Sequence, residues 1–392
     1  MRRLLGELGF SGNGTRFIHV AGTNGKGSVC AMIDSICRAE GIRSGLYTSP
    51  HLVTYRERIR LCGEMISEEQ TANGLTKIAR IIEGWEPHPT FFEITTALAF
   101  DVFGQEQAEV VALETGLGGR LDATNVLEGN GAALPAACVI TSIDIDHQAL
   151  LGRTIGQIAG EKAGIIKPGV PVVSAPQKQE AAAVLVQTAL DKKSSLEFIS
   201  APIEKYPVGL AGSHQKLNAA LSVAALRAAG IKVSEESIRN GLLTVSWPGR
   251  FQIINHPCVK NTLVIDGAHN EAAALRLMET WREVFGDEKA VLILGVLKDK
   301  DVTAVCRALV AVASGCIVIP VRSPRASAPE ELIAIIRQLA PELDCKTARG
   351  FTEALETAAA SPGKILVAGS LFLAGEALAF FDGHDIPEMS LQ

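Results

Sequence analysis

The stretch GTNGKGS at positions 22–28 carries residue types that bind phosphate. Lys26 lies between two glycines, and the hydroxyl of Ser28 comes one position later than in the usual phosphate-binding loop, which also has a glycine where this chain has Val20. An apolar stretch precedes the loop and a helical pattern follows it, so the positive end of a helix would face an anion while Lys26 adds a mobile charge. Gly27 leaves room for a phosphate chain close to the backbone. The loop therefore predicts binding of a nucleotide's phosphates, with a simple glycine-rich turn as the alternative.

Carboxylates and a histidine follow two further apolar stretches. Glu114 ends the run EVVALE and precedes several glycines, and Asp144, Asp146 and His147 come just after CVITSI. Because the carboxyl ends of parallel strands face one crevice, we expect Glu114 beside the phosphates, where a carboxylate suits Mg²⁺. A solvated loop carboxylate is the alternative for Glu114, and a structural histidine is the alternative for His147. The carboxylates beside His147 favour a metal ligand.

Composition bounds the class of protein. The 392 residues are 47% hydrophobic and 20% charged, which predicts a globular chain of two domains. The net charge of -6 and the scattered Lys and Arg give no basic surface, so no nucleic-acid partner is expected. No apolar run reaches the length of a membrane helix, and the polar start MRRLLGELGF is unlike a signal peptide. Eight cysteines without a C-x-x-C pair fit a reducing compartment, so we expect a cytoplasmic protein. We also expect a monomer that does not bind a membrane.

Strand-like apolar runs alternate with helical patterns, which predicts parallel sheets covered by helices. The helix after the phosphate loop is expected to begin at Ser28 and to end on Gly41. A second set of runs begins after the Trp-Pro-Gly segment at 247–249, which we take as the domain boundary. The sequence thus predicts an α/β fold, with a P-loop ATPase domain over residues 1–246, built on a mostly parallel sheet, and a smaller Rossmann-like domain over residues 247–392. The expected strands are RFIHVAG, EVVALETG, CVITSI and VPVVSA in the first domain, and TLVID, AVLILGV, CIVIPV and KILVAG in the second.

Lys162 lies in IGQIAGEKAGIIKPG, a helical stretch with glycines, and alone would be taken for a surface lysine. Further motifs occur with it in order along nearly the whole chain: HVAGTNGKGS, YTSPHLVTYRERI, ETGLGGRLDATN, DHQALLG, EKAGIIKPG, HQKLNAALSVAAL, PGRFQ, DGAHN and GSLFLAGE. Together they resemble the folylpolyglutamate synthases and the related bifunctional dihydrofolate synthases of the Mur ligase superfamily. The resemblance implies an ATP-dependent ligase that adds L-glutamate to a folate or to dihydropteroate. It also implies that residues 1–246 bind ATP and that residues 247–392 form a glutamate-ligase domain.

The resemblance assigns roles to the matching residues. Two Mg²⁺ ions would bridge the ATP phosphates to the acceptor, with Ser49 and Glu114 holding the first ion and His147 the second. Lys162 corresponds to a carbamylated lysine, whose carbamate is an anion suited to Mg²⁺. The residues implied in ATP binding are Asn24, Gly25, Lys26, Gly27, Ser28, Asn218, Arg250 and Asp266. Those that resemble the pterin-binding segments are Phe91, Phe92, Glu93, Leu121, Asp122 and Ala123.

The residue chemistry favours the same reaction. The chain has neither a G-x-S-x-G elbow nor an evident activated cysteine, so no covalent enzyme intermediate is expected. A substrate carboxylate would attack the γ-phosphate of ATP, assisted by Lys26 and Arg250, and the amine of glutamate would attack the resulting acyl phosphate. His269 of DGAHN is a candidate for holding or deprotonating that amine, with a structural histidine as an equal alternative.

Two other functions share parts of the pattern. A Mur-type cell-wall ligase commonly has Ser or Thr at the position of Gly27 and lacks the TSPHL segment. A P-loop switch protein, which binds nucleotide without ligating a substrate, would have no use for Glu114, His147 and Lys162 together. Both comparisons favour the folate ligase.

Sixteen residues precede Phe17, fewer than in many relatives, whose longer start contributes to the dihydropteroate pocket. We therefore expect glutamate addition to tetrahydrofolates, with dihydropteroate as a second acceptor.

Overall fold

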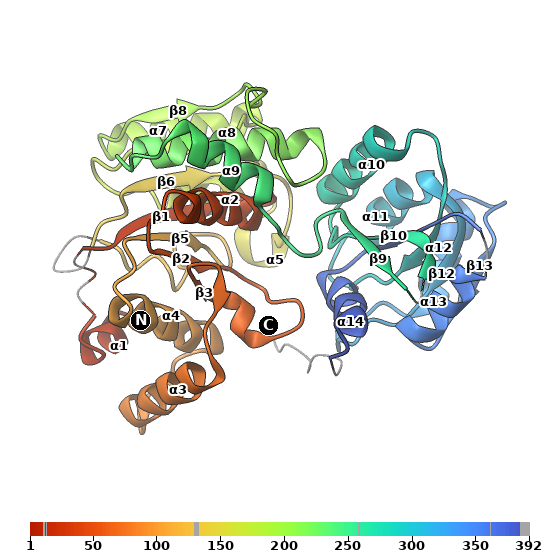
Figure 1. Cartoon of the computed structure of the whole chain (residues 1–392), viewed down its shortest axis with the longest axis horizontal. Helices are drawn as coiled ribbons and strands as arrows, with labels where there is room; N and C mark the ends of the chain where they lie inside the picture. The colour runs from red at the N-terminus through yellow and green to blue at the C-terminus, as the bar shows by residue number, and fades with distance from the viewer. Residues whose placement is uncertain (11, 13, 129–132, 258, 361, 385–392) are drawn as a thin grey trace. The chain divides into compact units, whose positions relative to one another are not determined.

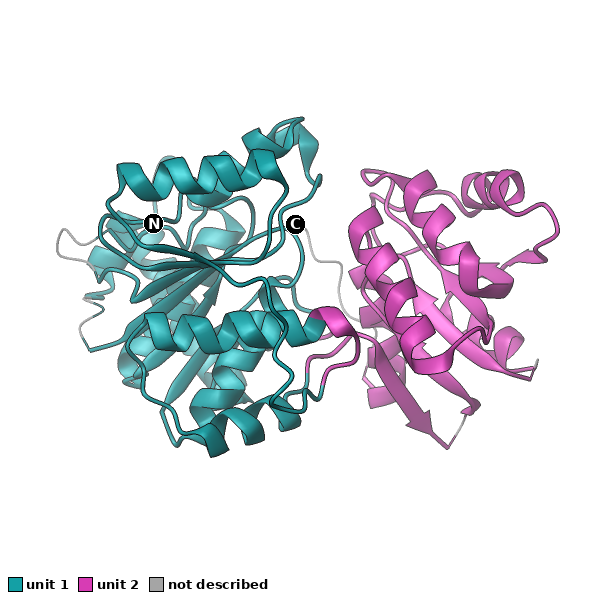
Figure 2. Cartoon of the chain, turned by 90° about the horizontal axis from the view of Figure 1, so that it is seen from above, with its two compact units in different colours: residues 1–51, 56–209, 215–246 teal, residues 52–55, 210–214, 247–392 magenta. Residues whose placement is uncertain are grey.

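The computed structural model describes residues 1–10, 12, 14–128, 133–257, 259–360 and 362–384. The chain divides into two compact units, which Figure 2 colours separately. The segment LEGNGAALPAA at 127–137, whose composition predicts a surface loop, lies partly outside the described residues, as does Cys258. Unit 1 comprises residues 1–51, 56–209 and 215–246, and unit 2 comprises residues 52–55, 210–214 and 247–392.

Unit 1 is built on a sheet whose described strands run in the order β4-β3-β2-β5-β1-β6-β7-β8. The strands from β2 to β8 in this order are parallel, while β3 and β4 form an antiparallel extension at one edge. β5 is buried along its whole length and β1 at every residue after its first, as expected for apolar strands covered on both faces. The strand bounds are β1 Arg16–Ala21, β2 Ser44–Tyr47, β3 Ile59–Leu61, β4 Glu64–Met65, β5 Val110–Glu114, β6 Ala137–Ile140, β7 Val172–Ser174 and β8 Leu196–Phe198.

Helices cover both faces of this sheet (Figure 1). Ser44 of β2 donates a hydrogen bond to Asp34 of α2. Its neighbour Gly45 points to the opposite face, where a Cβ atom would lie 2.7 Å from the ring of Phe103 on α4. On these two layers α9 packs against α2 and α3 packs against α4. The helix bounds are α1 Arg2–Glu7, α2 Lys26–Ala39, η1 Tyr55–Arg58, α3 Glu68–Ile82, α4 Phe91–Gln105, α5 Gln148–Leu151, α6 Ile155–Ala163, α7 Gln179–Asp191, α8 Ser213–Ala228 and α9 Glu235–Thr244.

Unit 2 has a sheet with the described order β13-β12-β11-β14-β10-β9, in which β9 alone runs antiparallel to its neighbour. One face packs on α10, α11 and α12, with Trp281 fully buried, and the other face packs on α13 and α14. The α/β class predicted from the sequence is therefore confirmed. The bounds are β9 Gln252–His256, β10 Val259–Ile265, α10 Glu271–Phe285, β11 Ala290–Leu294, α11 Val302–Leu309, η2 Val310–Val312, β12 Ala313–Val318, α12 Pro329–Leu339, β13 Cys345–Thr347, α13 Phe351–Ala359, β14 Lys364–Ala368 and α14 Leu371–Asp382.

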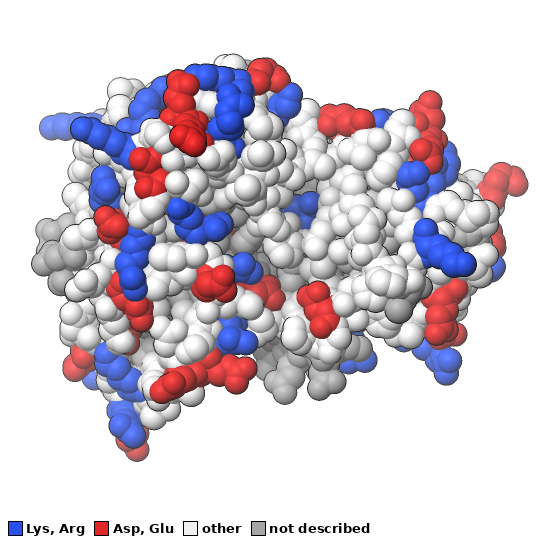
Figure 3. Space-filling model, in the orientation of Figure 1, with Lys and Arg blue, Asp and Glu red and all other residues white. Residues whose placement is uncertain are grey.

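The surface carries charges of both signs. Figure 3 shows Lys and Arg side chains interspersed with Asp and Glu over the face in view. None of the helices in the described part of the chain combines the length and apolar character that crossing a bilayer requires.

Candidate active site

Three loops of unit 1 meet at the carboxyl edge of its sheet. β1 lies between β5 and β6 and runs parallel to both, so the loops that follow these three strands leave the sheet side by side. From β1 the chain continues to β2, which lies on the β5 side of β1. From β5 it continues to β6, which lies on the other side of β1. The strand order therefore reverses at β1. Open α/β sheets bind ligands at such a point. The phosphate loop, Glu114 and the segment with His147 are the residues at this edge.

The phosphate loop joins β1 directly to α2. Gly25 caps the helix with φ at 93°, a left-handed conformation that favours glycine, and its carbonyl accepts a hydrogen bond from the N–H of Val29 at 3.0 Å. The helix begins at Lys26, so the predicted start at Ser28 is wrong by two residues, because the left-handed turn at Gly25 already aligns the next residues in helical geometry. The N–H groups of this first turn have no partner within the helix. They are thus oriented to receive an anion.

Lys26 and Glu114 form the charged centre of this edge. The Lys26 Nζ atom lies 3.8 Å from Glu114 Oε1 and donates to the carbonyl of Thr23 at 3.4 Å. Glu114 Oε2 accepts the backbone N–H of Ser49 at 3.2 Å. Three residues that the sequence placed in separate motifs therefore lie together, although Glu114 comes from β5 and Ser49 follows β2.

The segment after β6 is tied to the phosphate loop by backbone and hydroxyl groups. The N–H of Thr23 donates to the carbonyl of Ser142 at 2.8 Å, and the Thr23 hydroxyl donates to the carbonyl of Asp144 at 3.1 Å. Thr23 is a positioning residue that the sequence did not single out, since its partners lie more than a hundred positions away. The Asp144 carboxylate pairs with Lys178 Nζ at 2.7 Å.

His147 begins the short helix α5 with φ at 50°. Its backbone N–H donates to Asp146 Oδ1 at 2.8 Å, and its ring Nε2 lies 3.9 Å from the same oxygen. The side chain is 40% exposed, so it can reach a ligand at the sheet edge.

Lys162 is a buried lysine in the last turn of α6. Its Nζ donates to the carbonyl of Gly22, at the beginning of the phosphate loop, at 2.7 Å. Burial and then the charge of Lys26 lower the pKa of Lys162 from 10.5 to about 7, while Asp146 and Asp122 oppose that shift. A surface lysine, the alternative from sequence, is excluded, because the side chain lies beneath the phosphate loop.

Two amide side chains of α8 lie against the phosphate loop. A Cβ atom on Gly25 would lie 2.9 Å from Asn218 Oδ1, and the Asn218 amide donates to Gln215 Oε1 at 2.9 Å. The Gln215 amide in turn donates to the Ser28 hydroxyl at 3.5 Å. Asn218 was predicted and Gln215 was not, although it stands three positions earlier and thus on the same helical face.

The segments predicted to bind the pterin combine exposed apolar groups with carboxylates that organise the backbone. Phe91 is 48% exposed and Leu121 is 79% exposed. Glu93 forms a capping box with Thr90 at the start of α4 and accepts the chain's N-terminal ammonium at 3.3 Å. Phe92 and Ala123, the other predicted members, are partly buried.

Asp122 holds the loop after β5 in its conformation. Its carboxylate accepts the N–H of Leu117 at 2.8 Å, the N–H of Thr124 at 3.0 Å and the Thr124 hydroxyl at 2.6 Å. Burial raises the pKa of Asp122, and these hydrogen bonds oppose the shift. The Asp122 carboxylate therefore positions the loop after β5, in addition to any contact that it makes with a substrate.

We expect Asp122→Asn to lower the free energy of unfolding by about 1–3 kcal/mol, because the new NH₂ group faces donors that then lose their acceptor. Chemical denaturation followed by circular dichroism measures the change. Asp191→Asn, at an exposed residue of α7, is the matched control and should change stability by less than about 0.5 kcal/mol. Equal stabilities of the two variants would contradict the role of Asp122.

Unit 2 carries the remaining predicted residues on the loops before β9 and after β10. Asp266 Oδ2 accepts the N–H of Phe251 at 2.7 Å and its Oδ1 accepts the N–H of Ala268 at 2.8 Å. Burial raises the pKa of Asp266, and the charge of Arg250 opposes this shift. Arg250 donates to the carbonyl of Gly249 at 3.0 Å, and a Cβ on Gly267 would lie 2.8 Å from its guanidinium.

His269 makes a hydrogen bond through Nδ1 to the carbonyl of Gly267 at 2.8 Å. Because a carbonyl only accepts, Nδ1 carries the proton in this hydrogen bond, and in a neutral ring the lone pair is then on Nε2. This tautomer is the one that can take a proton through Nε2.

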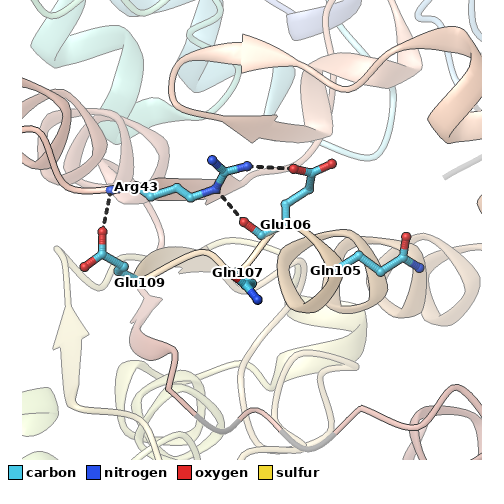
Figure 4. Close-up of a pocket in the computed structure, with 5 residues that line it drawn as sticks. All are labelled: Arg43, Gln105, Glu106, Gln107 and Glu109. Atoms are coloured by element: carbon cyan, nitrogen blue, oxygen red, sulfur yellow. Dashed lines mark hydrogen bonds and ion pairs between the residues drawn. The ribbon is translucent and has the colours of Figure 1, made fainter.

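A separate pocket of about 390 Å³ lies at the opposite edge of the unit 1 sheet, before β2 and β5 (Figure 4). Arg43 donates to Glu106 Oε2 at 2.7 Å, and its backbone N–H donates to Glu109 Oε1 at 3.0 Å. Arg43 is thus ion-paired with Glu106, while a backbone N–H holds the Glu109 carboxylate. Gln105 and Gln107 complete the lining.

Comparison with known proteins decides the family. The dihydrofolate synthase/folylpolyglutamate synthase of Bacillus subtilis is 36% identical to this chain over 365 residues, which are 85% of this chain and 83% of that protein. The chain belongs to the folylpolyglutamate synthase/dihydrofolate synthase family. It is therefore an ATP-dependent ligase, as the motifs predicted, and the cell-wall ligase is the less supported alternative.

Members of this folylpolyglutamate synthase family share the fold. A Mycobacterium tuberculosis folylpolyglutamate synthase complexed with ADP superposes with a TM-score of 0.88 at 32% identity, covering 98% of this chain and 94% of that one. A bifunctional folylpolyglutamate synthase/dihydrofolate synthase with manganese, AMPPNP and L-glutamate bound gives a TM-score of 0.85 at 28% identity, covering 97% and 93%. Residues 249–371 match the family described as Mur ligase, glutamate ligase domain. Family members thus bind adenine nucleotide, a divalent metal and glutamate.

Proposed function

We propose that this chain adds L-glutamate to the γ-carboxylate of a reduced folate and to dihydropteroate, using ATP to form an acyl phosphate. The observation that carries the proposal is the meeting of Lys26, Glu114 and Ser49 at the start of α2, where a helix end, an ammonium group and a carboxylate converge. Such a site binds a nucleotide phosphate together with a divalent cation. Family membership supplies the acceptor class.

The proposed metal ligands are Ser49, Glu114, His147 and a modified Lys162, for two Mg²⁺ ions. Within the described residues no three His, Cys, Asp or Glu side chains form a metal-binding group by themselves. The residues nevertheless fit Mg²⁺, because that ion takes one or two carboxylates and completes its shell with water and substrate phosphate oxygens. Bound there, the ions would neutralise charge on the transferring phosphate.

We propose that Lys162 carries CO₂ as a carbamate. The unprotonated amine attacks the carbon of CO₂, an N–C bond forms, and a proton leaves to solvent. Burial favours the uncharged amine over the ammonium. The product replaces a cation near Asp146 and Asp122 with an anion that can ligate a metal.

The chain's residues then act by placement and charge. Lys26 and Arg250 hold the γ-phosphate while a folate carboxylate oxygen attacks phosphorus and ADP leaves. The glutamate amine attacks the acyl carbon, phosphate departs, and His269 accepts the amine proton at Nε2. Asn24, Gly25, Gly27, Ser28, Asn218 and Asp266 complete the proposed ATP contacts.

The exposed apolar groups of the α4 start and the β5 loop form the proposed pterin surface. Phe91 and Leu121 present aromatic and aliphatic area to solvent, while Glu93 and Asp122 fix the segments that carry them. Phe92 and Ala123 contribute the remaining contacts.

Since every assigned residue comes from one chain and the cosubstrate is ATP, we propose a monomer acting in the cytoplasm.

The proposal predicts that phosphate release from ATP and Mg²⁺ requires both L-glutamate and a pterin acceptor. Separate reactions offer tetrahydrofolate, dihydropteroate or a UDP-linked cell-wall precursor, and mass spectrometry identifies each product. Turnover of both pterins supports a bifunctional enzyme, and tetrahydrofolate alone restricts the activity to polyglutamate synthesis. Turnover of the cell-wall precursor alone would overturn the proposal.

We expect Gly25→Ala to weaken ADP binding at least about tenfold, because its Cβ would lie 2.9 Å from Asn218 Oδ1 at a φ of 93°. Calorimetric titration with ADP and Mg²⁺ measures the affinity. Gly84→Ala is the control, since Gly84 also has positive φ, at 71°, but has no atoms within 4 Å of the new Cβ. Equal ADP affinities in the two variants would remove the Gly25–Asn218 contact from the account.

A further inference from the structure

Cys316 and Cys345 lie side by side on neighbouring strands of unit 2. They are direct register partners on β12 and on the edge strand β13, which run parallel. Cys316 is buried in the core below α10, α11 and α12, and Cys345 packs at the margin of the same core. Register partners on parallel strands point to one face, and their Cα atoms are about 4.8 Å apart, within the range that a disulfide spans.

The two thiols are linked by a hydrogen bond and differ in accessibility. The Cys316 thiol donates to Cys345 Sγ, and the Cys345 thiol donates to the carbonyl of Leu343 at 3.4 Å. The hydrogen bond from Cys316 lowers the pKa of Cys345, and Arg337 adds to this effect, while the same bond and burial raise the pKa of Cys316. Cys345 is partly exposed and Cys316 is not. Solvent reagents therefore meet Cys345 first, with Cys316 directly behind it.

We propose that Cys345 and Cys316 form a dithiol that low-molecular-weight disulfides convert into an intramolecular disulfide. The Cys345 thiolate attacks one sulfur of the reagent disulfide, a mixed disulfide forms, and the first reagent thiolate leaves. The Cys316 sulfur then attacks Cys345 Sγ, its proton passes to solvent, and the second reagent thiolate leaves. Two cysteine thiols are oxidised and one reagent disulfide is reduced to two thiols, so the step balances.

The disulfide would tie the edge strand β13 to β12 and close the segment that contains α12. Cross-linking two distant positions restricts the unfolded chain, so the oxidised protein should melt a few degrees higher than the reduced protein. This inference does not depend on the proposed ligase reaction, because none of its residues contributes to that site.

The full-length protein treated with oxidised glutathione tests the proposal by peptide mass spectrometry. In the wild type we expect the peptides of Cys316 and Cys345 to be joined with the loss of two hydrogen atoms, while the exposed Cys62 carries glutathione. In Cys316→Ala, Cys345 should keep its glutathione adduct, because the resolving thiol is gone. In Cys345→Ala, Cys316 should remain unmodified.

The wild-type peptide map decides the matter even if a variant fails to fold. A stable glutathione adduct on wild-type Cys345, or an unmodified Cys345 beside a fully modified Cys62, would overturn the proposal. A melting temperature that rises on oxidation and returns with dithiothreitol in the wild type, but not in Cys316→Ala, would support it.

Discussion

Lys26→Ala should lower kcat about a thousandfold, on the order of 4 kcal/mol of transition-state stabilisation, because a charge at the transferring phosphate acts most strongly when negative charge develops. The fold should survive, since the Lys26 ammonium is partly solvated and its contacts are with Glu114 and the Thr23 carbonyl. Steady-state phosphate release with saturating ATP, tetrahydrofolate and L-glutamate measures the loss.

Two controls separate chemistry from folding. Lys205→Ala removes an exposed lysine of unit 1 and should leave kcat within about twofold. Thermal melting should show that Lys26→Ala stays within about 1 kcal/mol of the wild type. A folded Lys26→Ala protein with near-normal kcat would remove the phosphate loop from the mechanism.

Lys162→Met should lower kcat at least about a hundredfold, and it should also make the protein more stable. The amine is lost, so no carbamate can form, but an apolar side chain of similar length relieves the burial that lowers the pKa of Lys162 to about 7. Since the unfolded lysine holds its proton up to higher pH than the folded one, wild-type protein kept free of CO₂, and so without the carbamate, gains stability as pH rises from about 7 to 10.5. This gain should vanish in Lys162→Met. At neutral pH the variant should gain about 1–4 kcal/mol in the free energy of unfolding.

The carbamate has its own readout. Wild-type protein under ¹³CO₂ should show a carbamate ¹³C resonance that is missing in Lys162→Met. Lys162→Ala leaves space where the side chain was, so small carboxylates such as formate should restore part of its activity, and formate should not restore Lys162→Met. Full activity of Lys162→Met, or wild-type protein without a carbamate signal during turnover, contradicts the proposed modification.

The sequence predicted the strands that are buried on both faces. RFIHVAG, EVVALETG, CVITSI and VPVVSA became β1, β5, β6 and β7 within three residues at each end, because an apolar run of this length is stable mainly as a strand buried in the sheet. It missed β2, β3, β4, β8, β9 and β13. Ser44–Tyr47 includes a glycine and a serine, and Cys345–Thr347 is a short edge strand, so neither carries a periodic apolar signal.

Residues next to strand ends could be grouped from the sequence, because parallel strands bring their carboxyl ends to one edge. That argument placed Glu114 beside Lys26, and the structure brings them to 3.8 Å. Contacts made by distant helices could not be found in this way. Gln215 reaches Ser28 only because α8 packs on the phosphate loop, and the hydrogen bonds that Asp122 accepts depend on the path of its loop.

The most direct test of the account follows an oxygen atom from the acceptor. Tetrahydrofolate labelled with ¹⁸O in the γ-carboxylate is incubated with the wild-type protein, ATP, Mg²⁺ and L-glutamate, and the released phosphate is analysed by mass spectrometry. If a carboxylate oxygen attacks phosphorus and the amine later expels phosphate, each phosphate should carry one ¹⁸O atom, and the elongated folate should lose one label. Phosphate that forms without ¹⁸O, at a rate independent of glutamate, would contradict ligation through an acyl phosphate.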